Sequence, residues 1–545
     1  MKRTIYFLIA ATVLMLMSCK DFLEEKQRDA LTEDEAFQSM KDLKNNAVLS
    51  LYNYIGGNSD SQGLQGTGRG VYDLNTMTTD EAITPTRGGD WYDGGFWQDL
   101  FLHTWGSSNT ALENTWNYLF KVVMLCNSSL ERIDAYPNPE HFYDETMLDN
   151  YRAEVRAVRA MFYFYLMDLF GRVPIVTTND VNASELTLAN RSQVYQFIVK
   201  ELQETRPYLP WDRSNYNGEN YGRVTIPVAN FLLAKLMLNA EIYSDDNWTD
   251  NIYPDGKTIT FNVLGKTMNA WEACQFYCNT FKDFEYVLEE SLAENFTTTN
   301  EKSRENIFTI PMDPNLYSNR FIYFFRSRNC CHGSALGGGS ENGPCATIET
   351  LRAFKYGKPD QDARFDVTFY ADTIYEDGEV VLMDDKVTPL VYYPWEVKLN
   401  LTGSPYVELA GARFRKYTPD PNANADGRAC HNDIVLFRYA DVLLMMAEAK
   451  LRNGEDGTAE LNLVRHRSLM TDTVATLETI LNERHLELAW EGWRRNDLIR
   501  FRQFTRSYTD RPQLPGEENG YTTVFPIPSS MIDFHPSWKQ NPGYE

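Results

Sequence analysis

The chain has 545 residues, of which 43% are hydrophobic, and it carries a formal net charge of -24 from 76 acidic and 52 basic residues. This length allows one large core, or a core with a substantial insertion. The acidic excess argues against a surface for nucleic acid or anionic lipid, because such surfaces need clustered lysine and arginine. Aromatic residues make up 13% of the chain, which suits a protein that stacks on a flat ligand.

The start of the chain has the pattern of an export signal that ends at a cysteine. A charged beginning, Met1–Arg3, is followed by an apolar run to Met17 and then by Ser18 and Cys19. At about 1.5 Å per residue in a helix, this run is far shorter than the roughly 30 Å core of a bilayer. A small residue directly before cysteine is typical of a bacterial lipobox, so we predict that Cys19 is the lipidated first residue of the mature protein.

Several segments have the apolar spacing of amphipathic helices. The clearest is 151–171, which ends at Gly171 shortly before Pro174. Residues 438–454, followed by a second helical pattern that opens at Thr458, predict two antiparallel helices, the unit of tetratricopeptide solenoids. The spacing predicts further helices at about 33–54, 107–134, 191–206, 227–244, 270–291 and 474–503.

Two stretches interrupt this helical pattern. Residues 295–432 are rich in Gly, Pro and Asn and contain short β-like runs such as FIYFF and VVLM, so they predict an irregular insertion. A similar loop-rich segment extends from Gly56 to Gly106. The predicted fold class is therefore mainly α, with tetratricopeptide-like helical hairpins and a loop-rich insertion that contains short strands.

Three carboxylates, those of Glu483, Glu487 and Glu491, stand four residues apart and would share one helix face, an arrangement that can hold a metal or perform acid–base chemistry. Arginines lie close by, and Glu491 to Arg495 has the favourable i to i+4 order, so we favour structural ion pairs. A second stripe contains arginines, and we hypothesise that the two stripes meet across a helix packing. The arginines of this second stripe are Arg152, Arg156 and Arg159.

The sequence offers no firm catalytic or metal motif. It has no HExxH, GxSxG or Walker pattern, and the cysteines that follow Cys19 lack paired CxxC spacings. Residues 422–433 have the spacing of a calcium loop, but Asn422 stands first and Asp433 stands where a bidentate Glu belongs. We therefore predict no enzyme activity, no cofactor and no metal, although a glycosidase needs only two carboxylates and stays an alternative.

Five separated stretches resemble the SusD/RagB family of surface lipoproteins, and with the lipobox the resemblance covers essentially the whole chain. The stretches are RAEVRAVRAMFYFYLMDLFGRVPIV, RYADVLLMMAEA, NERHLELAWEGWRRNDLIRF, FPIPSSMI and the terminal QNPGYE. The resemblance implies a SusD-like α superhelix that is lipid-anchored on the cell surface at the outer membrane. It also implies that the protein acts as the lid of a SusC-like TonB-dependent transporter and captures a nutrient, usually an oligosaccharide.

The resemblance, with the change of composition, divides the chain into four regions. Residues 1–18 are a signal peptide, and residues 19–294 are an N-terminal SusD-like helical region with a binding loop at about 56–106. The irregular insertion covers 295–432, and the C-terminal SusD/RagB helical region covers 433–545.

The best candidate for a ligand-binding surface is RGGDWYDGGFWQDLFLHTW, residues 87–105. Its glycines mark turns, and aromatic residues this close together cannot all fold inward easily. In the family, this early loop often supplies an aromatic residue that stacks on the ligand, for which Trp91 is the first choice. The other candidates in this loop are Arg87, Asp90, Tyr92, Asp93 and Trp97.

A second group of candidates lies in the insertion, where the family also places binding aromatics. Tyr317, Arg320 and His332 are the residues named there. The predicted function is non-catalytic capture of a glycan, with capture of a peptide, known for RagB-like relatives, as the alternative within binding. A surface glycoside hydrolase is the alternative of a different class, and a pure interaction scaffold is the remaining one.

Overall fold

The computed structural model describes residues 35–57, 62–65, 68–136, 145–315, 326–423 and 429–544. The predicted signal peptide and Cys19 lie outside these ranges, as does the FIYFF run at 321–325. Within them the chain is mainly helical, and the strands are short and form two-stranded sheets. This confirms the predicted fold class.

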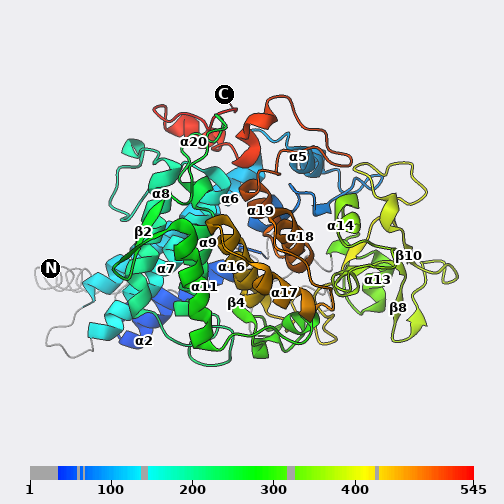
Figure 1. Cartoon of the computed structure of the whole chain (residues 1–545), viewed down its shortest axis with the longest axis horizontal. Helices are drawn as coiled ribbons and strands as arrows, with labels where there is room; N and C mark the ends of the chain where they lie inside the picture. Colours follow the sequence, from blue (N-terminus) through cyan, green and yellow to red (C-terminus); the bar gives the residue numbers. More distant parts are fainter. Residues whose placement is uncertain are drawn as a thin grey trace, which may run out of the picture.

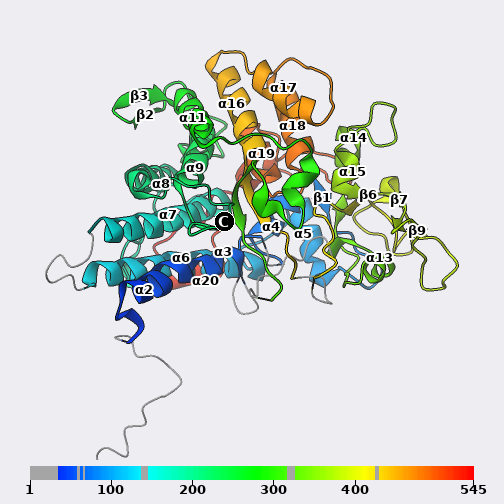
Figure 2. The ribbon, with the colours of Figure 1, turned by 90° about the horizontal axis from the view of Figure 1, so that it is seen from below.

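Consecutive helices of the N-terminal half pack side by side and continue into the C-terminal half (Figures 1 and 2). Within α7, every side chain from Ala157 to Phe170 is buried. The sequence predicted one buried face for this helix, but α6 and α8 both pack against it, and a helix that is apolar on all sides belongs in the core. The helices of this stack are α6 (Thr110–Ala135), α7 (Glu145–Phe170), α8 (Arg191–Thr205), α9 (Ile226–Leu238) and α11 (Ala270–Asn279).

The predicted C-terminal hairpin is confirmed by α16 (Tyr439–Asn453) and α17 (Thr458–Arg467), which pack together. Helix α16 ends at Gly454, whose φ of 93° is in the left-handed region that glycine adopts without strain. The turn is tight, because a Cβ atom on Gly457 would lie 2.3 Å from the carbonyl oxygen of Ala447.

The single helix predicted at 474–503 is instead two helices, α18 (Leu477–Leu488) and α19 (Arg494–Arg500). The break contains Trp490, which has a φ of 65°. The Trp490 N–H donates to the Glu81 carboxylate over 3.0 Å, and its carbonyl accepts from the Tyr72 hydroxyl over 2.8 Å. Contacts with residues more than 400 positions away therefore override the local helical pattern.

Shorter helices fill the rest of the described chain. The pattern at 33–54 becomes a series of short helical turns that includes α2 and α3, rather than one helix. The pattern at 227–244 is divided between α9 and α10. The short helices are α2 (Met40–Leu43), α3 (Asn53–Gly56), α4 (Val71–Thr76), α5 (Phe96–Leu102), α10 (Ala240–Tyr243), α13 (Cys330–Ala335), α14 (Ile348–Ala353), α15 (Phe365–Thr368) and α20 (Ser529–Phe534).

The strand pairs are antiparallel, and two of them position the insertion. Strands β4 (Asn306–Ile310) and β12 (Ile434–Arg438) pair at its two ends, so the chain leaves and rejoins the helical frame at one place. Strand β1 (Ala82–Ile83) pairs with β5 (Cys345–Ala346) and so joins the early loop to the insertion. The other pairs are β2 (Thr260–Val263) with β3 (Lys266–Asn269), β6 (Phe369–Tyr370) with β11 (Arg413–Phe414), β7 (Asp372–Thr373) with β10 (Val391–Tyr392), and β8 (Tyr375–Glu376) with β9 (Glu379–Val380).

A cluster of four carboxylates and four cations is buried where the insertion meets α17 and α18. The Glu487 carboxylate contacts the guanidinium groups of Arg364 at 3.0 Å and Arg438 at 2.5 Å, and it also pairs with Arg467. No side chain of the cluster is more than 3% exposed. We call this set the buried ion cluster, and its members are Glu305, Arg364, Lys416, Arg438, Arg467, Glu483, Glu487 and Glu491.

Each charge of the cluster is offset by its neighbours. Arg364 pairs with Glu483 at 2.6 Å, and Glu491 pairs with Lys416 at 2.5 Å and with Arg438 at 2.7 Å. Burial alone would raise the pKa of Glu487, but the guanidinium groups around it hold that pKa well below its usual range.

The prediction that these glutamates form ion pairs is confirmed, but the predicted partners are wrong. Glu491 lies beyond the end of α18 and does not pair with Arg495, which contacts Asp168 at 3.0 Å instead. The arginine stripe of α7 finds its partners nearby. Arg152 contacts Asp134 at 2.6 Å, and Glu201 of α8 contacts both Arg156 and Arg159 at 2.6 Å. The two stripes do not pair, and carboxylates of α6 and α8 contact the arginines of α7 instead.

Replacing Glu487 with glutamine should lower the free energy of unfolding by about 3–5 kcal/mol, because it leaves buried guanidinium groups without their counter-charge. A double-mutant cycle with Arg438→Met, followed by urea denaturation, should give a coupling of about 0.5–3 kcal/mol.

The matched control is a cycle between Glu487→Gln and Arg156→Met, whose side chains do not pair. The two effects should add within about 0.5 kcal/mol. A coupling in this control as large as that with Arg438 would contradict the assignment of partners.

No helix among the described residues is both long enough and apolar enough to cross a membrane.

Candidate functional site

The early loop identified from the sequence is docked on the insertion through main-chain hydrogen bonds. Besides the β1–β5 pair, the Thr86 N–H donates to the carbonyl of Leu399 over 3.0 Å, and the Leu401 N–H donates to the carbonyl of Thr86 over 2.9 Å. Figures 1 and 2 both show α5 on the same half of the molecule as α14 and the short strands of the insertion. The loop and the insertion therefore present one continuous surface.

Arg87 links the two segments from inside. Its side chain is buried, and its guanidinium donates to the carbonyls of Val407 at 2.8 Å, Ala410 at 3.0 Å and Gly343 at 3.3 Å. Burial, together with the nearby Arg413, lowers the pKa of Arg87 to about 9. Arg87, which the sequence analysis placed among the ligand contacts, thus positions the loop by donating hydrogen bonds to three carbonyl groups.

Trp91 lies half-buried against the insertion. Its indole N–H donates to the carbonyl of Glu341 over 2.8 Å, and its ring covers Gly343 so closely that a Cβ atom there would lie 2.4 Å from the ring. The Trp97 ring lies 5.6 Å away between centroids, and the Arg326 guanidinium lies 5.8 Å from the Trp91 ring centroid. The Trp91 ring is therefore held in one orientation, which a stacking surface requires.

The other candidates of the loop differ in exposure. Trp97 is 2% exposed and donates its indole N–H to the Asp93 carboxylate over 2.7 Å. Asp93 also pairs with Arg69 at 2.9 Å, whereas Asp90 is exposed and Tyr92 is 58% exposed. The structure brings these residues together, with Tyr92, Asp90 and part of Trp91 accessible to a ligand. Their binding roles stay predictions.

The candidates in the insertion are only partly described. Tyr317 and Arg320 lie outside the described residues. His332 of α13 is buried, with its Nδ1 atom 3.1 Å from the Tyr392 hydroxyl and its Nε2 atom 2.9 Å from the Glu376 carboxylate. His332 therefore does not face a ligand, and its contact with the Glu376 carboxylate is made from the buried side of that residue.

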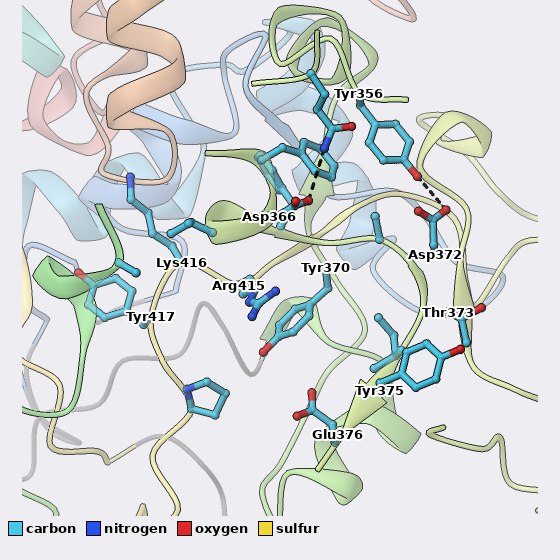
Figure 3. Close-up of a pocket in the computed structure, with 18 of the residues that line it drawn as sticks. Tyr356, Asp366, Tyr370, Asp372, Thr373, Tyr375, Glu376, Arg415, Lys416 and Tyr417 are labelled. Atoms are coloured by element: carbon cyan, nitrogen blue, oxygen red, sulfur yellow. Dashed lines mark hydrogen bonds between the residues drawn. The ribbon is translucent and has the colours of Figure 1, made fainter. Parts of the chain in front are cut away.

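A cleft that the sequence analysis did not identify lies within the insertion and has a volume of about 760 Å³ (Figure 3). Its walls come from residues 356–376, from Trp395 and from residues 415–419. The side chains are scattered along the chain in no recognised motif, so the local richness in aromatics, as in FYADTIYE at 369–376, was the one available signal.

Aromatic side chains form part of the cleft. The Tyr356 ring stacks on Phe365 with centroids 4.6 Å apart and lies 6.0 Å from the ring of Trp395. Trp395 is 46% exposed and Tyr375 is 60% exposed. Such exposure costs free energy that contact with a ligand would recover.

Polar groups stand at the edges of these rings. The Tyr356 hydroxyl donates to the Asp372 carboxylate over 2.8 Å, and Gln361 donates to Asp366 over 3.4 Å. Burial and the hydrogen bond to Asp372 raise the pKa of Tyr356, so this hydroxyl keeps its proton. Figure 3 shows the Arg415 guanidinium beside the Tyr370 ring, 5.3 Å from its centroid.

The cleft rests on the buried ion cluster. Lys416 lines the cleft with its aliphatic stem. Its ammonium group points away from the cleft, because it donates to the Glu491 carboxylate and, over 2.6 Å, to the carbonyl of Ala489. Arg364 of the cluster directly precedes Phe365, on which Tyr356 stacks. The cleft and the buried ion cluster are therefore adjacent, through Lys416 and through the chain at Arg364 and Phe365.

The described part of the calcium-like loop and the three glutamates of the sequence analysis lie outside the cleft. No group of three or more potential metal ligands occurs among the described residues. Residues 424–428 of the calcium-like loop lie outside them, and Asp433 at its end accepts from the N–H of Met312 over 3.0 Å. Glu483, Glu487 and Glu491 belong to the buried ion cluster, as the predicted structural ion pairs require.

Gly343→Ala should displace Trp91, because the added Cβ atom would overlap its ring. We expect the free energy of unfolding to fall by about 1–3 kcal/mol, as for other overpacked contacts, together with a change in near-ultraviolet circular dichroism. Gly89→Ala is the matched control, since a Cβ atom there meets nothing within 4 Å. Equal effects of the two substitutions would contradict this packing.

His332 should make the folded protein sensitive to acid. Burial lowers its pKa in the folded state despite the hydrogen bond to Glu376, whereas an unfolded histidine titrates near pH 6.5. Its contribution to stability is therefore complete above about pH 6.5 and is lost as the pH falls toward the lowered pKa.

Thermal unfolding of the parent and of His332→Gln should show this effect. Between about pH 7 and pH 5, the Tm of the parent should fall by more than the Tm of the variant. His466→Gln, at an exposed position, serves as the control. A difference between parent and His332→Gln that does not change with pH would contradict the buried neutral histidine.

Together, the helical hairpins and the aromatic insertion define a binding protein whose exposed rings and polar edges suit a flat ligand. A family model described as "SusD family" matches residues 239–544, and one described as "Starch-binding associating with outer membrane" matches residues 21–253. The chain belongs to the SusD family.

Two relatives align with this chain over most of its length. The "Starch-binding protein SusD" of Bacteroides thetaiotaomicron is 25% identical, over 99% of this chain and 98% of that protein. A SusD-like protein of Formosa agariphila is 24% identical, over 90% of this chain and 88% of that protein. The first of these relatives is named as a binding protein, in agreement with the prediction of a non-catalytic protein.

Solved structures confirm the fold. Surface glycan-binding protein A from Bacteroides uniformis superposes with a TM-score of 0.68 at 21% identity, covering 93% of this chain and all of that one. Surface glycan-binding protein A from Bacteroides thetaiotaomicron, solved in complex with laminarihexaose, gives a TM-score of 0.69 at 19% identity, covering 92% of this chain and 99% of that one.

Proposed function

We propose that this protein captures oligosaccharides at the cell surface and passes them to a SusC-like TonB-dependent transporter, on which it acts as the lid. Cys19 is the lipid-bearing residue that ties it to the outer membrane, and the helical region and the insertion follow the boundaries given above. A covalently attached acyl chain contributes about 0.8 kcal/mol per buried methylene group, so a multiply acylated terminus needs no membrane-spanning helix.

The observation that carries this proposal is the fixed, partly exposed ring of Trp91 in a chain that belongs to the SusD family. Sugar rings have an apolar face of C–H groups, which stack on aromatic rings. The hydrogen bond to Glu341 and the contact with Gly343 hold Trp91 in place, so little conformational entropy is lost when a sugar stacks on it. Asp90 and Tyr92 flank Trp91 in the chain and are exposed, so we assign to them the hydrogen bonds to the sugar hydroxyl groups.

The glycoside hydrolase alternative gains no support from Glu483, Glu487 and Glu491, because their carboxylates are buried and paired with cations. A general acid or base must reach the substrate, and these three cannot. The names of the relatives also favour glycan capture over capture of a peptide, since starch and laminarihexaose appear among them.

Native gels cast with a panel of polysaccharides test the proposal on residues 20–545. We expect at least one polysaccharide to slow the parent protein, and Trp91→Ala to weaken this binding by roughly tenfold, since a stacked aromatic pair contributes about 0.5–1.5 kcal/mol beyond its buried area.

Trp211→Ala is the matched control, because Trp211 is 59% exposed and packs on Phe284, outside the early loop and the cleft. Migration of the parent that no polysaccharide changes would contradict glycan capture. Equal losses in Trp91→Ala and Trp211→Ala would contradict the place assigned to the stacking surface.

A further inference from the structure

We propose that the cleft of Figure 3 is a second carbohydrate-binding site, separate from the Trp91 surface and selective for neutral oligosaccharides. This inference rests on the proposed function, because it assigns a second ligand contact to the same glycan. None of the residues that line the cleft belongs to the early loop. Its volume of about 760 Å³ lies within the usual range of ligand sites.

Pre-formed aromatic surfaces are the first argument. Tyr356 is held on one side by Phe365, at 4.6 Å between centroids, and at its hydroxyl by Asp372, at 2.8 Å. The neighbouring ring of Trp395 is 46% exposed. Because Tyr356 is already fixed, stacking a sugar on this pair loses little side-chain entropy.

The second argument is a guanidinium group in the cleft that is not neutralised. Arg415 is exposed and lines the cleft. Within the described chain, no carboxylate oxygen lies within 4 Å of its guanidinium nitrogen atoms. The Tyr370 ring, 5.3 Å away, supports the guanidinium and so orients its donors. A planar fork of N–H donors that faces a cleft can bind adjacent sugar hydroxyl groups.

The charges around the cleft select the class of saccharide. Asp366 and Asp372 are exposed, and Glu376 is accessible in part. Against these three carboxylates the cleft presents Arg415, since the ammonium group of Lys416 is turned into the buried ion cluster. A negative rim repels uronic acids and sulfated sugars, while carboxylates accept hydrogen bonds from neutral sugar hydroxyls.

A second site near the Trp91 surface would strengthen binding of long glycans. The early loop and the insertion are joined by β1–β5 and by Arg87, so the two sites keep a fixed separation. A chain long enough to reach both sites binds the second one as an intramolecular step, which raises the overall affinity. Polysaccharides should therefore bind more tightly than short oligosaccharides of the same sugar.

Titration calorimetry on residues 20–545 tests the inference with hexasaccharides of laminarin, starch, mannan, xylan and polygalacturonate. The variants are Trp91→Ala, Trp395→Ala, Tyr375→Ala and the control Trp211→Ala. Because the rings of Trp395 and Tyr375 are exposed, Trp395→Ala and Tyr375→Ala should have nearly the Tm of the parent. We expect a neutral hexasaccharide to occupy two sites in the parent and one in either Trp91→Ala or Trp395→Ala.

The outcomes separate the two proposals. Unchanged stoichiometry and affinity in both Trp395→Ala and Tyr375→Ala, with binding lost in Trp91→Ala, would overturn the second site and leave glycan capture standing. Binding of the polygalacturonate hexasaccharide that Trp395→Ala abolishes would overturn the selectivity for neutral sugars. Absence of binding by the parent to every saccharide of the panel would overturn both proposals.

Discussion

Glu487 accepts hydrogen bonds from three guanidinium groups that come from three parts of the chain: the insertion, the end of β12 and the end of α17. A buried carboxylate without these partners would be strongly destabilising, so each segment can reach its place only when the others do. The cluster need not raise the free energy of unfolding, because the cost of removing its charges from water offsets their mutual attraction. What it provides is a defined position for the insertion on the helical frame.

The two surfaces considered for ligands depend on this position in different ways. The cleft adjoins the cluster directly, because Arg364 precedes Phe365, on which Tyr356 stacks, and because Lys416 belongs to both. The Trp91 surface depends on the position of the insertion indirectly, because Arg87 and β1 attach the early loop to the insertion. Rigid support of this kind is what a binding site needs if it is to order few groups when the ligand arrives.

Sequence reasoning recovered the features that are local and missed those that depend on distant partners. Apolar spacing predicted α7 and the α16–α17 hairpin, and glycines around Trp91 predicted a loop with aromatic rings. The break at Trp490 was not predicted, because Glu81 and Tyr72 that cause it lie more than 400 residues away. The spacing of the glutamates predicted ion pairs, but spacing carries no information about which arginines lie opposite. The cleft escaped notice for the same reason, since its walls meet only in the folded insertion.

Apart from Lys416, the side chains that line the cleft and those that form the buried ion cluster are different residues. Tyr375 and Trp395 are exposed at the surface, while the buried ion cluster lies beneath. Substitution of an exposed residue away from such buried features usually changes stability by no more than about 0.5 kcal/mol. Mutation can therefore alter the exposed rings without disturbing the buried ion cluster, so the shape and chemistry of this surface can change through substitutions that are nearly neutral for stability.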